Sequence, residues 1–469
     1  MERQVIGTRA AFRDALRTKS GIFGFGMLIF LLSLVVVIPF LAPYDVVQTW
    51  NDVSKWTDNP RMAKPDWIDA FSSVKEARNV VKDWDDFDIY ESNTSGSLKV
   101  ILLRTKWDFA WDVFPPELRL ELLSSWADRK PLITVEWERP DKETIEIFTA
   151  APTAAAPLVQ TLSISTETSV MSRVEMWAKA VAGAENVTLV RPHVTLYAQK
   201  EPGMLDPARS TVLKGGYKLT ITVIAFDAND TVNARFISYG TVFGLAGTDN
   251  FRRDLFIGLL WGAPVALAFG SAAAVITVMS SVVFGALGAY FGGRVDELIQ
   301  RMTDFLIILP VLPILILLAQ MGVRSLIAIL GVVIVFNILG GATKVVRSIA
   351  LQVKEELFVE SARSYGASRL RILFRYILPR TTPYSFSLLA LSVPSFIFLE
   401  AALSFLGLGD PTIPTWGSIL GDAQRNGAAY NEKWWWMALP ASGIIFTTIA
   451  FVFLGYSFDT VLNPRLREE

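Results

Sequence analysis

Six long stretches without a charged side chain constrain this chain more than any other feature of its sequence. They cover residues 20–44, 255–293, 305–323, 325–343, 381–399 and 434–458. Because a helix rises about 1.5 Å per residue, roughly 20 residues cross a hydrocarbon core that is about 30 Å thick. We therefore predict an all-α polytopic membrane protein whose six transmembrane helices lie at about 21–44, 265–290, 305–323, 325–343, 381–403 and 436–458.

The second stretch is too long for a single span. Pro264 lies within it, and a proline removes one backbone hydrogen bond from a helix. We therefore predict a break at this proline, with an interfacial helix over residues 254–261 and a membrane helix from about Val265 to Tyr290.

The composition agrees with a membrane protein and excludes several other classes. Hydrophobic residues make up 52% of the chain and charged residues 19%, whereas a soluble domain has about 25% charged residues. The 44 basic and 45 acidic residues nearly cancel, so we expect no nucleic-acid partner. Cysteine is absent and His193 is the single histidine, so we expect no metal site and no catalytic residue. We expect His193 itself to be a surface histidine or a hydrogen-bonded core histidine.

The distribution of lysine and arginine predicts the orientation of the spans, because short cytoplasmic flanks are enriched in both. With a cytoplasmic N-terminus, seventeen of them lie in the inner flanks 1–20, 291–303, 344–380 and 459–469, and three lie in the short outer loops. We therefore predict a multi-pass protein of the cell (inner or plasma) membrane, with both termini cytoplasmic and residues about 45–250 extracytoplasmic. The first span is expected to be an uncleaved anchor.

The predicted organisation has five parts. They are a cytoplasmic N-terminal segment (residues 1–20), a first transmembrane helix (21–44), an extracytoplasmic domain (45–245) and a membrane core with five transmembrane helices (246–469). The fifth part, a cytoplasmic loop (344–380), lies inside that core.

The extracytoplasmic domain differs in texture from the rest of the chain. Nine of the 14 tryptophans lie here, among charged residues and β-branched runs. Alternation of apolar and polar side chains predicts strands over residues 98–107, 132–137, 186–190 and 217–225, and residues 151–157 are typical of a linker. We expect an inserted β-rich (α+β) domain with mostly antiparallel strands. Its tryptophan-rich stretch, Trp50 to Trp84, is either a contact face for a partner or part of the core and membrane interface.

The cytoplasmic loop carries the most informative pattern. Helix-forming residues run to Tyr365, Gly366 suits a left-handed helix end, and Ser368 is placed to cap a second helix. That second helix is basic and amphipathic, and we predict that it ends at Pro379. A helix–glycine–helix element of this kind either docks into a groove of a partner protein or lies on the membrane surface.

The same loop resembles a known signature. Glu360-Ser-Ala362, Gly366 and Leu378-Pro379 are similar to the EAA-x3-G-x9-I-x-LP pattern of permease subunits in binding-protein-dependent ATP-binding cassette importers. Ser361 stands where the pattern has alanine, and Tyr376 stands where it has isoleucine. The resemblance implies that the segment from Glu360 to Ser368 couples the permease to an ATPase, with Gly366 as the turn and Ala362 and Ala367 allowing close approach.

Further blocks resemble the C-type permease of dipeptide, oligopeptide and nickel importers over residues 1–45 and 245–469. They include Gly247-Thr248-Asp249 followed by Arg253-Asp254, and Tyr290–Gly293 followed by Asp296-Glu297. They also include Glu400–Gly409, which contains Gly407 and Gly409, then Pro414–Gly417, which contains Trp416, and residues 462–466. Arg252 stands where the first block usually has glycine, and the large insertion is itself a departure from the family pattern.

The resemblance implies a transport subunit that hydrolyses no ATP itself, and the chain has no phosphate-binding loop. Its implied partners are a second similar permease, two cytoplasmic ATPases that hold ATP and Mg, an extracytoplasmic binding protein, membrane lipid and a peptide substrate. Nickel or another small solute is the alternative substrate. A membrane-anchored extracytoplasmic receptor and a self-contained secondary transporter are rivals from other classes. The inserted domain is expected to seat the binding protein or to guide its released ligand.

Two residues of the fifth span are candidates for the transport pathway. Glu400 interrupts an apolar stretch, and an acid within a membrane marks a functional site or a buried structural carboxylate. Pro394 is expected to kink the same helix, and Pro310 and Pro313 are expected to kink the third span. Ahead of the second span, Asp249 is expected to cap the interfacial helix, with contact to the binding protein as the alternative for its motif block.

Overall fold

The computed structural model describes residues 8–93, 98–153, 156–182, 191–201, 204–206 and 208–462. The chain forms two compact units. The helical unit comprises Met1–Asn51 and Phe256–Glu469, and the inserted domain comprises Asp52–Leu255. The predicted strand at 186–190, most of the block at 462–466 and the middle of the predicted linker at 151–157 lie outside the described residues.

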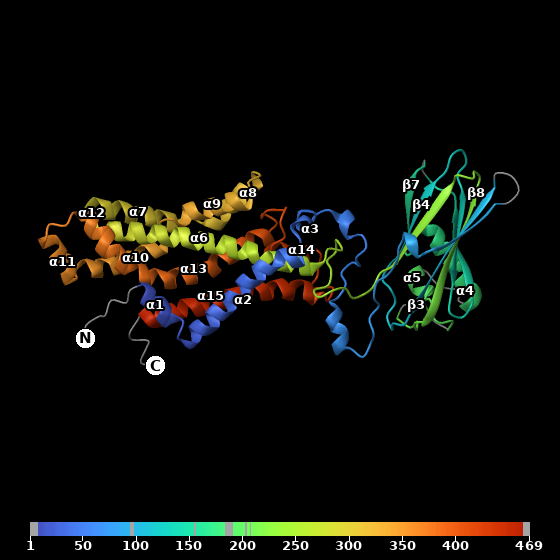
Figure 1. Ribbon diagram of the computed structural model, residues 1–469, viewed down its shortest axis with the longest axis horizontal. Helices are drawn as coiled ribbons and strands as arrows, with labels where there is room; N and C mark the ends of the chain where they lie inside the picture. The colour runs from blue at the N-terminus through green and yellow to red at the C-terminus, as the bar shows by residue number, and fades with distance from the viewer. Residues whose placement is uncertain are drawn as a thin grey trace. The chain divides into compact units, whose positions relative to one another are not determined.

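The helical unit consists of helices joined by short loops (Figure 1). In chain order they are α1 (Thr8–Ala15), α2 (Lys19–Leu41), α3 (Tyr44–Gln48), α6 (Leu255–Phe291), α7 (Gly293–Ile308), α8 (Val311–Gln320), α9 (Leu326–Asn337), α10 (Gly341–Lys354), α11 (Leu357–Ser364), α12 (Arg369–Ile372), the π-helical η4 (Leu373–Ile377), α13 (Leu378–Phe405), α14 (Trp416–Arg425) and α15 (Trp434–Leu462).

Among the described residues, four helical segments are long and apolar enough to cross a membrane. They are Lys19–Leu41, Leu255–Phe291, Arg369–Phe405 and Trp434–Val461. Two bent helix pairs, α7 with α8 and α9 with α10, bring the number to six if each pair crosses once. The chain is therefore a polytopic membrane protein with a β-rich insertion.

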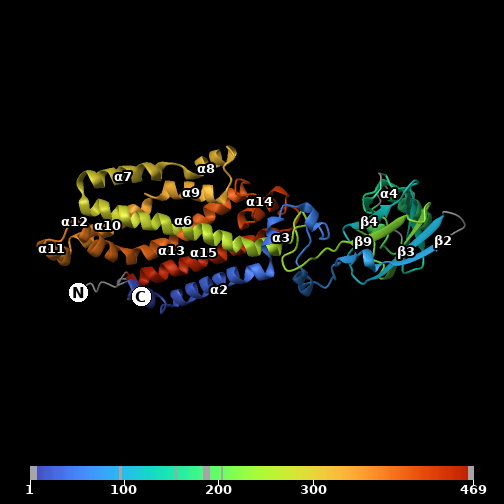
Figure 2. The ribbon, with the colours of Figure 1, turned by 45° about the horizontal axis from the view of Figure 1, so that its top comes forward.

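Both bends fall within or beside predicted spans, and the first lies at Pro310, where the sequence predicts a kink. α7 and α8 meet at 65° and α9 and α10 at 42° (Figure 2). Leu309 has a ψ of 128° directly before Pro310, because the proline ring disfavours helical backbone at the residue before it. Gly340 separates α9 from α10 with extended backbone. The kink expected at Pro310 is therefore confirmed, whereas the predicted spans 305–323 and 325–343 differ in their boundaries from the helices beside each bend.

The predicted break at Pro264 is also wrong, since α6 is one continuous helix of 37 residues that includes this proline. Two glycines ahead of the proline pack closely on aromatic rings. A Cβ at Gly258 would lie 2.7 Å from the Trp50 ring, and one at Gly262 would overlap the Trp416 ring. This packing supports the helical turn that leads into the proline, and one lost bond does not break a helix supported by its neighbours.

The helices pack around one shared core. α15 lies against both α13 and α2, and α14 contacts α13 and α15 (Figures 1 and 2). Large apolar side chains of α2, such as Phe23, Phe30 and Phe40, are exposed. An exposed apolar helix face of this kind is typical of contact with lipid.

The inserted domain contains two antiparallel sheets, as the sequence predicts. One has the strand order β1-β9-β4-β7 and the other β2-β3-β8-β5-β6. The strands are β1 (Val80–Lys82), β2 (Asp88–Asn93), β3 (Lys99–Phe109), β4 (Leu118–Ser125), β5 (Leu132–Glu138), β6 (Thr144–Ala150), β7 (Leu158–Ser163), β8 (Gly215–Ala225) and β9 (Thr231–Ser238). The domain also has the helices α4 (Thr168–Ala182) and α5 (Pro192–Thr195) and the 3-10 helices η1 (Val53–Trp56), η2 (Asp66–Phe71) and η3 (Trp84–Asp86).

Aromatic side chains join the two sheets. The Trp107 ring of β3 lies 5.1 Å from that of Trp137 on β5 and 4.7 Å from that of Phe236 on β9. All three are buried. In the predicted tryptophan-rich contact face, Trp50 and Trp56 are buried as well, so these two residues belong to the interior rather than to an exposed surface.

His193 differs from both alternatives that the sequence offers. It lies in α5 and is largely buried, and its Nδ1 has no hydrogen-bond partner in the part of the chain that the structure describes. Burial, with a smaller contribution from the nearby Arg191, lowers the pKa of His193 to about 4. The folded domain therefore holds the imidazole in its neutral form at neutral pH.

We predict that the inserted domain loses stability as the pH falls from the unfolded pKa of 6.5 to the folded pKa of about 4. The unfolded chain binds the proton in this interval and the folded chain does not, which amounts to roughly 3 kcal/mol over the full interval. Denaturant unfolding of the full chain in detergent, followed by tryptophan fluorescence, measures the loss. His193→Gln should flatten this part of the pH profile, and an unchanged profile would show that other groups cause it.

Candidate functional site

The loop between α10 and α13 turns at Gly366. The φ of Gly366 is +75°, in the left-handed region that favours glycine. Its amide donates to the Arg363 carbonyl at 3.0 Å, and the Ala367 amide donates to the Ala362 carbonyl at 3.1 Å. These bonds form a Schellman motif that ends α11. Ser368 then accepts an amide of α12 at 3.4 Å, so the predicted helix–glycine–helix geometry is confirmed.

The helix after this turn does not end at Pro379, contrary to the prediction. α12, η4 and α13 continue without a break from Arg369 to Phe405. The π turn is closed by the Leu378 amide, which donates to the Leu373 carbonyl, one residue further back than in an α-helix. Pro379 follows in the first turn of α13, where a missing amide costs little. The basic helix and the long apolar helix are therefore one continuous element.

Ala362 faces inward, which corrects the expectation that it allows close approach of a partner. It is buried in a cluster with Tyr290 of α6 and Ile372 of α12, and Ala367 packs against the same cluster. The small side chains therefore let α11 approach the rest of this chain. Ser361 is exposed, and its hydroxyl donates to the Leu357 carbonyl within α11.

The outer face of the loop carries large apolar side chains that the sequence analysis does not single out. The Tyr365 side chain is 92% exposed and that of Leu357 is 78% exposed, and Glu360 is exposed between them. The available signal is the position of Tyr365, an aromatic residue directly before the glycine of a helix end. An exposed pair of this kind is suited to burial against another protein.

Ion pairing fixes the helix that leads into the loop. Arg347 of α10 donates to both carboxylate oxygens of Asp296 on α7, at 2.6 and 2.5 Å. Lys354 at the end of α10 donates to the Ala289 carbonyl of α6 at 3.1 Å. A two-point arginine–carboxylate pair sets orientation as well as distance, so α10 enters the loop in a defined direction.

Glu400 lies in α13 with its side chain buried. The Ser404 hydroxyl donates to Oε1 of Glu400 at 2.7 Å, and the Thr415 hydroxyl also bonds the carboxylate. Thr415 is the N-cap of α14 and accepts the Ser418 amide at 3.1 Å. Glu400 therefore links α13 to the start of α14. Pro394 is buried within the same helix.

The motif after α13 forms a tight turn. Gly407 has a φ of +76°, and its amide donates to the Ser404 carbonyl at 2.9 Å. The Leu408 amide donates to the Leu403 carbonyl, also at 2.9 Å, which completes a second Schellman motif. A Cβ at Gly409 would overlap the Ser404 side chain. Both glycines are therefore required by backbone geometry and close packing.

Trp416, at the start of α14, packs against both α6 and α15. Its indole N–H donates to the Leu259 carbonyl of α6 at 2.9 Å. A Cβ at Gly443 of α15 would lie 2.7 Å from the ring, and Gly262 of α6 leaves room on another side. The next residue, Gly417, packs so closely on α13 that a Cβ would overlap the Ala401 backbone. The structure thus gives this motif a packing role.

The block before α6 has a different capping pattern from the predicted one. Asp249 Oδ1 accepts the amides of Phe251 and Arg253 at 2.8 and 2.9 Å, and Oδ2 accepts Arg253 Nε at 2.5 Å. α6 begins only at Leu255, so Asp249 stabilises the preceding turn and not the helix terminus. Gly247 has a φ of +75°, and its carbonyl accepts the Leu255 amide at 3.1 Å.

Thr248 and Asp254 complete this turn. The two residues form an isolated β-bridge, which brings the ends of the block together. The buried Thr248 hydroxyl accepts the Ala63 amide at 2.9 Å and donates to the Pro60 carbonyl at 2.6 Å. The block therefore also holds the segment by which the chain enters the inserted domain.

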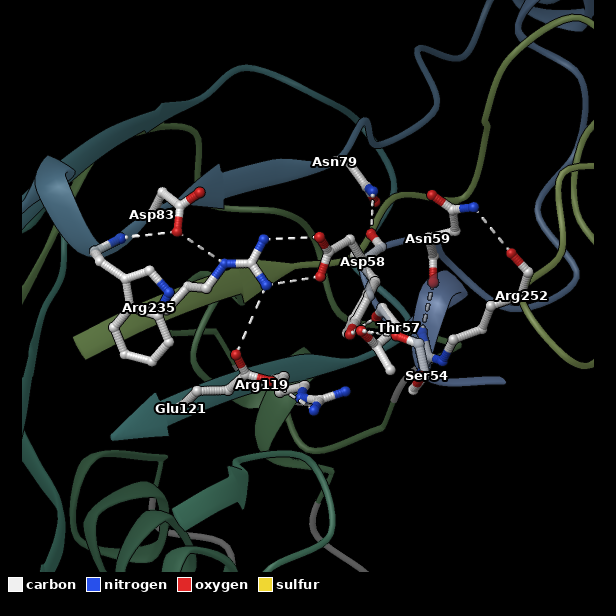
Figure 3. Close-up of polar contacts among 12 residues, drawn as sticks. Ser54, Thr57, Asp58, Asn59, Asn79, Asp83, Arg119, Glu121, Arg235 and Arg252 are labelled. Atoms are coloured by element: carbon white, nitrogen blue, oxygen red, sulfur yellow. Dashed lines mark hydrogen bonds and ion pairs between the residues drawn. The ribbon is translucent and has the colours of Figure 1, made fainter. Parts of the chain in front are cut away.

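Arg252 shows why the family pattern has glycine at this position. Its φ is +67°, a conformation that is costly for a residue with a side chain. The guanidinium donates to the Asn59 carbonyl at 2.7 Å (Figure 3). It also donates to Glu117 Oε2 at 2.6 Å and lies over the Tyr239 ring. These contacts hold Arg252 in the backbone conformation that glycine adopts more easily.

A second arginine holds the same entry segment. Arg235 of β9 donates to both carboxylate oxygens of Asp58 at 2.7 Å and also pairs with Asp83 (Figure 3). Its guanidinium lowers the pKa of the Asp58 carboxyl below its usual value. Asn79 donates to the Asp58 carbonyl at 2.9 Å. Entry and exit of the inserted domain are thus joined by a charged and hydrogen-bonded junction.

Comparison with known proteins identifies relatives of the membrane part. A family model described as binding-protein-dependent transport system inner membrane component matches residues 281–468. The chain is 33% identical to the oligopeptide transport system permease protein of Bacillus subtilis (strain 168) over 225 residues, which are 47% of this chain and 72% of the relative. It is 34% identical to the dipeptide transport system permease protein of the same organism, covering 47% and 68%. It is 32% identical to a glutathione transport system permease protein of Pectobacterium atrosepticum, covering 47% and 72%.

We predict that Gly417→Ala destabilises the helical unit by about 1–3 kcal/mol, because the added methyl group overlaps the α13 backbone. Thermal unfolding in detergent measures the change. Gly331→Ala in α9 is the matched control, because a Cβ there meets nothing within 4 Å. Equal melting temperatures for the two variants would contradict the close packing of α14 on α13.

Proposed function

Because this chain belongs to the family of binding-protein-dependent transport system inner membrane components, we propose that it forms half of the translocation pathway of an ATP-driven importer for di- and oligopeptides. It is a C-type permease, a transport component rather than an enzyme. The names of its relatives, which are oligopeptide, dipeptide and glutathione permeases, support the substrate class. Nickel or another small solute is the alternative within the same family.

The loop around Gly366 is the proposed contact with a cytoplasmic ATPase. The observation that supports it is the exposed pair Leu357 and Tyr365 on a turn that is fixed by its Schellman bonds. α12 continues directly into the long helix α13, so a push on the turn is carried along one rigid element. We assign Glu360, Gly366 and Ser368 to this element, with Ala362 and Ala367 supporting it from inside.

The proposed assembly contains further chains. A second, similar permease completes the pathway, two ATPases bind ATP and Mg, and an extracytoplasmic binding protein delivers the substrate. In this arrangement each bent pair, α7 with α8 and α9 with α10, crosses the membrane once, which gives six spans. Both termini are then cytoplasmic, and the inserted domain faces the side from which substrate arrives.

Purification of the tagged chain from its native membrane tests the assembly. Two ATPase chains and a second permease should copurify, and vesicles with the whole assembly should take up peptides only with ATP. Uptake by this chain alone would indicate a secondary transporter. Isolation without any partner would favour the anchored receptor.

We predict that Gly366→Val abolishes peptide uptake and substrate-stimulated ATP hydrolysis while the protein is still made. A β-branched residue at a φ of +75° costs about 1–2 kcal/mol and displaces the exposed pair. Gly366→Asn is the matched control, because asparagine tolerates left-handed backbone and should retain most of the coupling. Full coupling in Gly366→Val would refute the docking role. A cysteine at Tyr365 should also cross-link to the ATPase.

We predict that Glu400→Gln lowers the uptake of neutral and cationic peptides by the same factor. Its bonds to Ser404 and Thr415 favour a packing role over a contact with substrate charge. Glutamine keeps the shape and much of the hydrogen bonding but removes the charge. Competition assays with matched neutral and lysine-containing peptides measure the ratio, and a selective loss for cationic peptides would place Glu400 in the pathway.

A further inference from the structure

One sheet of the inserted domain ends in a strand with a free edge. β7 is the last strand in the order β1-β9-β4-β7, and β4 is its one neighbour in that sheet among the described residues. Figure 1 shows β7 beside β4 in the inserted domain. An edge strand exposes a row of backbone groups that can pair with another chain.

The register shows which backbone groups of β7 face outward. The Tyr239 amide donates to the Glu117 carbonyl, so odd-numbered residues of β4 bond β9 and even-numbered residues bond β7. Leu122 is the partner of Gln160 in β7. Even-numbered residues of β7 therefore bond β4, and Val159 and Thr161 direct their amides and carbonyls away from the sheet.

These outward groups have no backbone partner among the residues that the structure describes. No hydrogen bond to the backbone of Val159 or Thr161 from that side occurs within the described ranges of the chain. Both side chains are exposed as well. The edge thus offers two donors and two acceptors, with the two residues about 7 Å apart along the strand.

β7 also lacks the charged side chains that normally protect an edge. Residues 151–166 contain no charged side chain, although charged side chains and bulges usually block pairing with a new strand. The other edges differ in this respect. β2 carries Asp88 and Glu91, and β6 carries Glu146, which is paired with Arg173. β1 has three residues and ends at Lys82.

The sheet face next to this edge is apolar at one position and polar at the next. Val159 lies directly opposite Leu123 of β4, and both side chains are exposed. Thr161 lies opposite Glu121, which is paired with Arg119. An added strand would therefore meet an apolar surface beside Val159 and a hydrogen-bonding surface beside Thr161.

We propose that the β7 edge binds an extended oligopeptide, which adds to the sheet as a further strand. The proposal rests on the proposed function, because that function brings peptides to this side of the membrane. Recognition through main-chain groups suits peptides of many sequences, since every peptide has the same backbone pattern. The uncharged edge places no demand on the charge of the peptide, and the contact with Val159 and Leu123 favours an apolar residue there.

A peptide whose backbone amides can all donate hydrogen bonds tests the site. The probe is a fluorescein-labelled hexapeptide of alternating valine and threonine, added to the full chain in lipid nanodiscs without partner chains. Fluorescence anisotropy should show saturable binding. A twin of the probe that is N-methylated at every residue should bind at least about tenfold more weakly, because it cannot donate the main-chain bonds. Equal binding of the two peptides, or no binding of the free peptide, would overturn the proposal.

Two variants locate the site at β7. Val159→Pro removes an outward amide and leaves the bonds between β7 and β4 in place, so it should weaken binding about tenfold. Val159→Thr keeps the amide and a β-branched side chain, so it should weaken binding by no more than about twofold, through the lost apolar contact alone. If the proline variant does not fold, as judged by tryptophan fluorescence, the comparison of the two peptides still decides.

Two further outcomes separate this proposal from its alternatives. A chain that forms dimers which Val159→Pro dissociates would show that a second copy occupies the edge, and this would overturn the peptide site. Copurification of the ATPases tests the importer independently, since it does not involve β7. Peptide binding can therefore fail while the importer assembly stands.

Discussion

In a hydrocarbon layer every backbone amide and carbonyl needs a partner within the protein, and this requirement shapes the whole helical unit. It explains why apolar segments remain helical through residues that would end a soluble helix. α6 runs through Pro264, and α13 runs through Pro394. The chain bends within its apolar segments at Pro310 and Gly340, where local sterics or the absence of a side chain favour extended backbone.

Once the segments are helical, small residues decide how closely they pack. Apolar side chains gain little from leaving lipid for protein, so close van der Waals contact has to provide the attraction between helices. The Trp416 ring fits between Gly262 and Gly443, and Gly417 meets the backbone of α13. The motif glycines are thus explained by contact between backbones, and the geometry around Glu400 follows from the same packing of α13 and α14.

Local signals could be predicted from the sequence, and long-range ones could not. The turn at Gly366 with its cap at Ser368 is set by a few neighbouring residues, and the antiparallel strands follow from alternation. The inward direction of Ala362 depends on α6, and no pattern in the loop alone reveals it. Asp249 was expected to cap a helix, but the chain first makes a further turn to reach α6. Hydropathy marks the apolar stretches and Pro310 marks the bend between α7 and α8, but neither signal indicates the second bend at Gly340.

The backbone conformation of Arg252 matters for any shortened version of this chain. Its left-handed backbone is tolerated because Asn59, Glu117 and Tyr239 hold the side chain, and all three belong to the inserted domain. Deletion of residues 52–240 would remove these three residues and leave a strained arginine without its contacts, three residues before α6 begins. A compact version of the protein should therefore restore glycine at this position together with the deletion. The effect of deleting the insertion therefore depends on which residue stands at position 252.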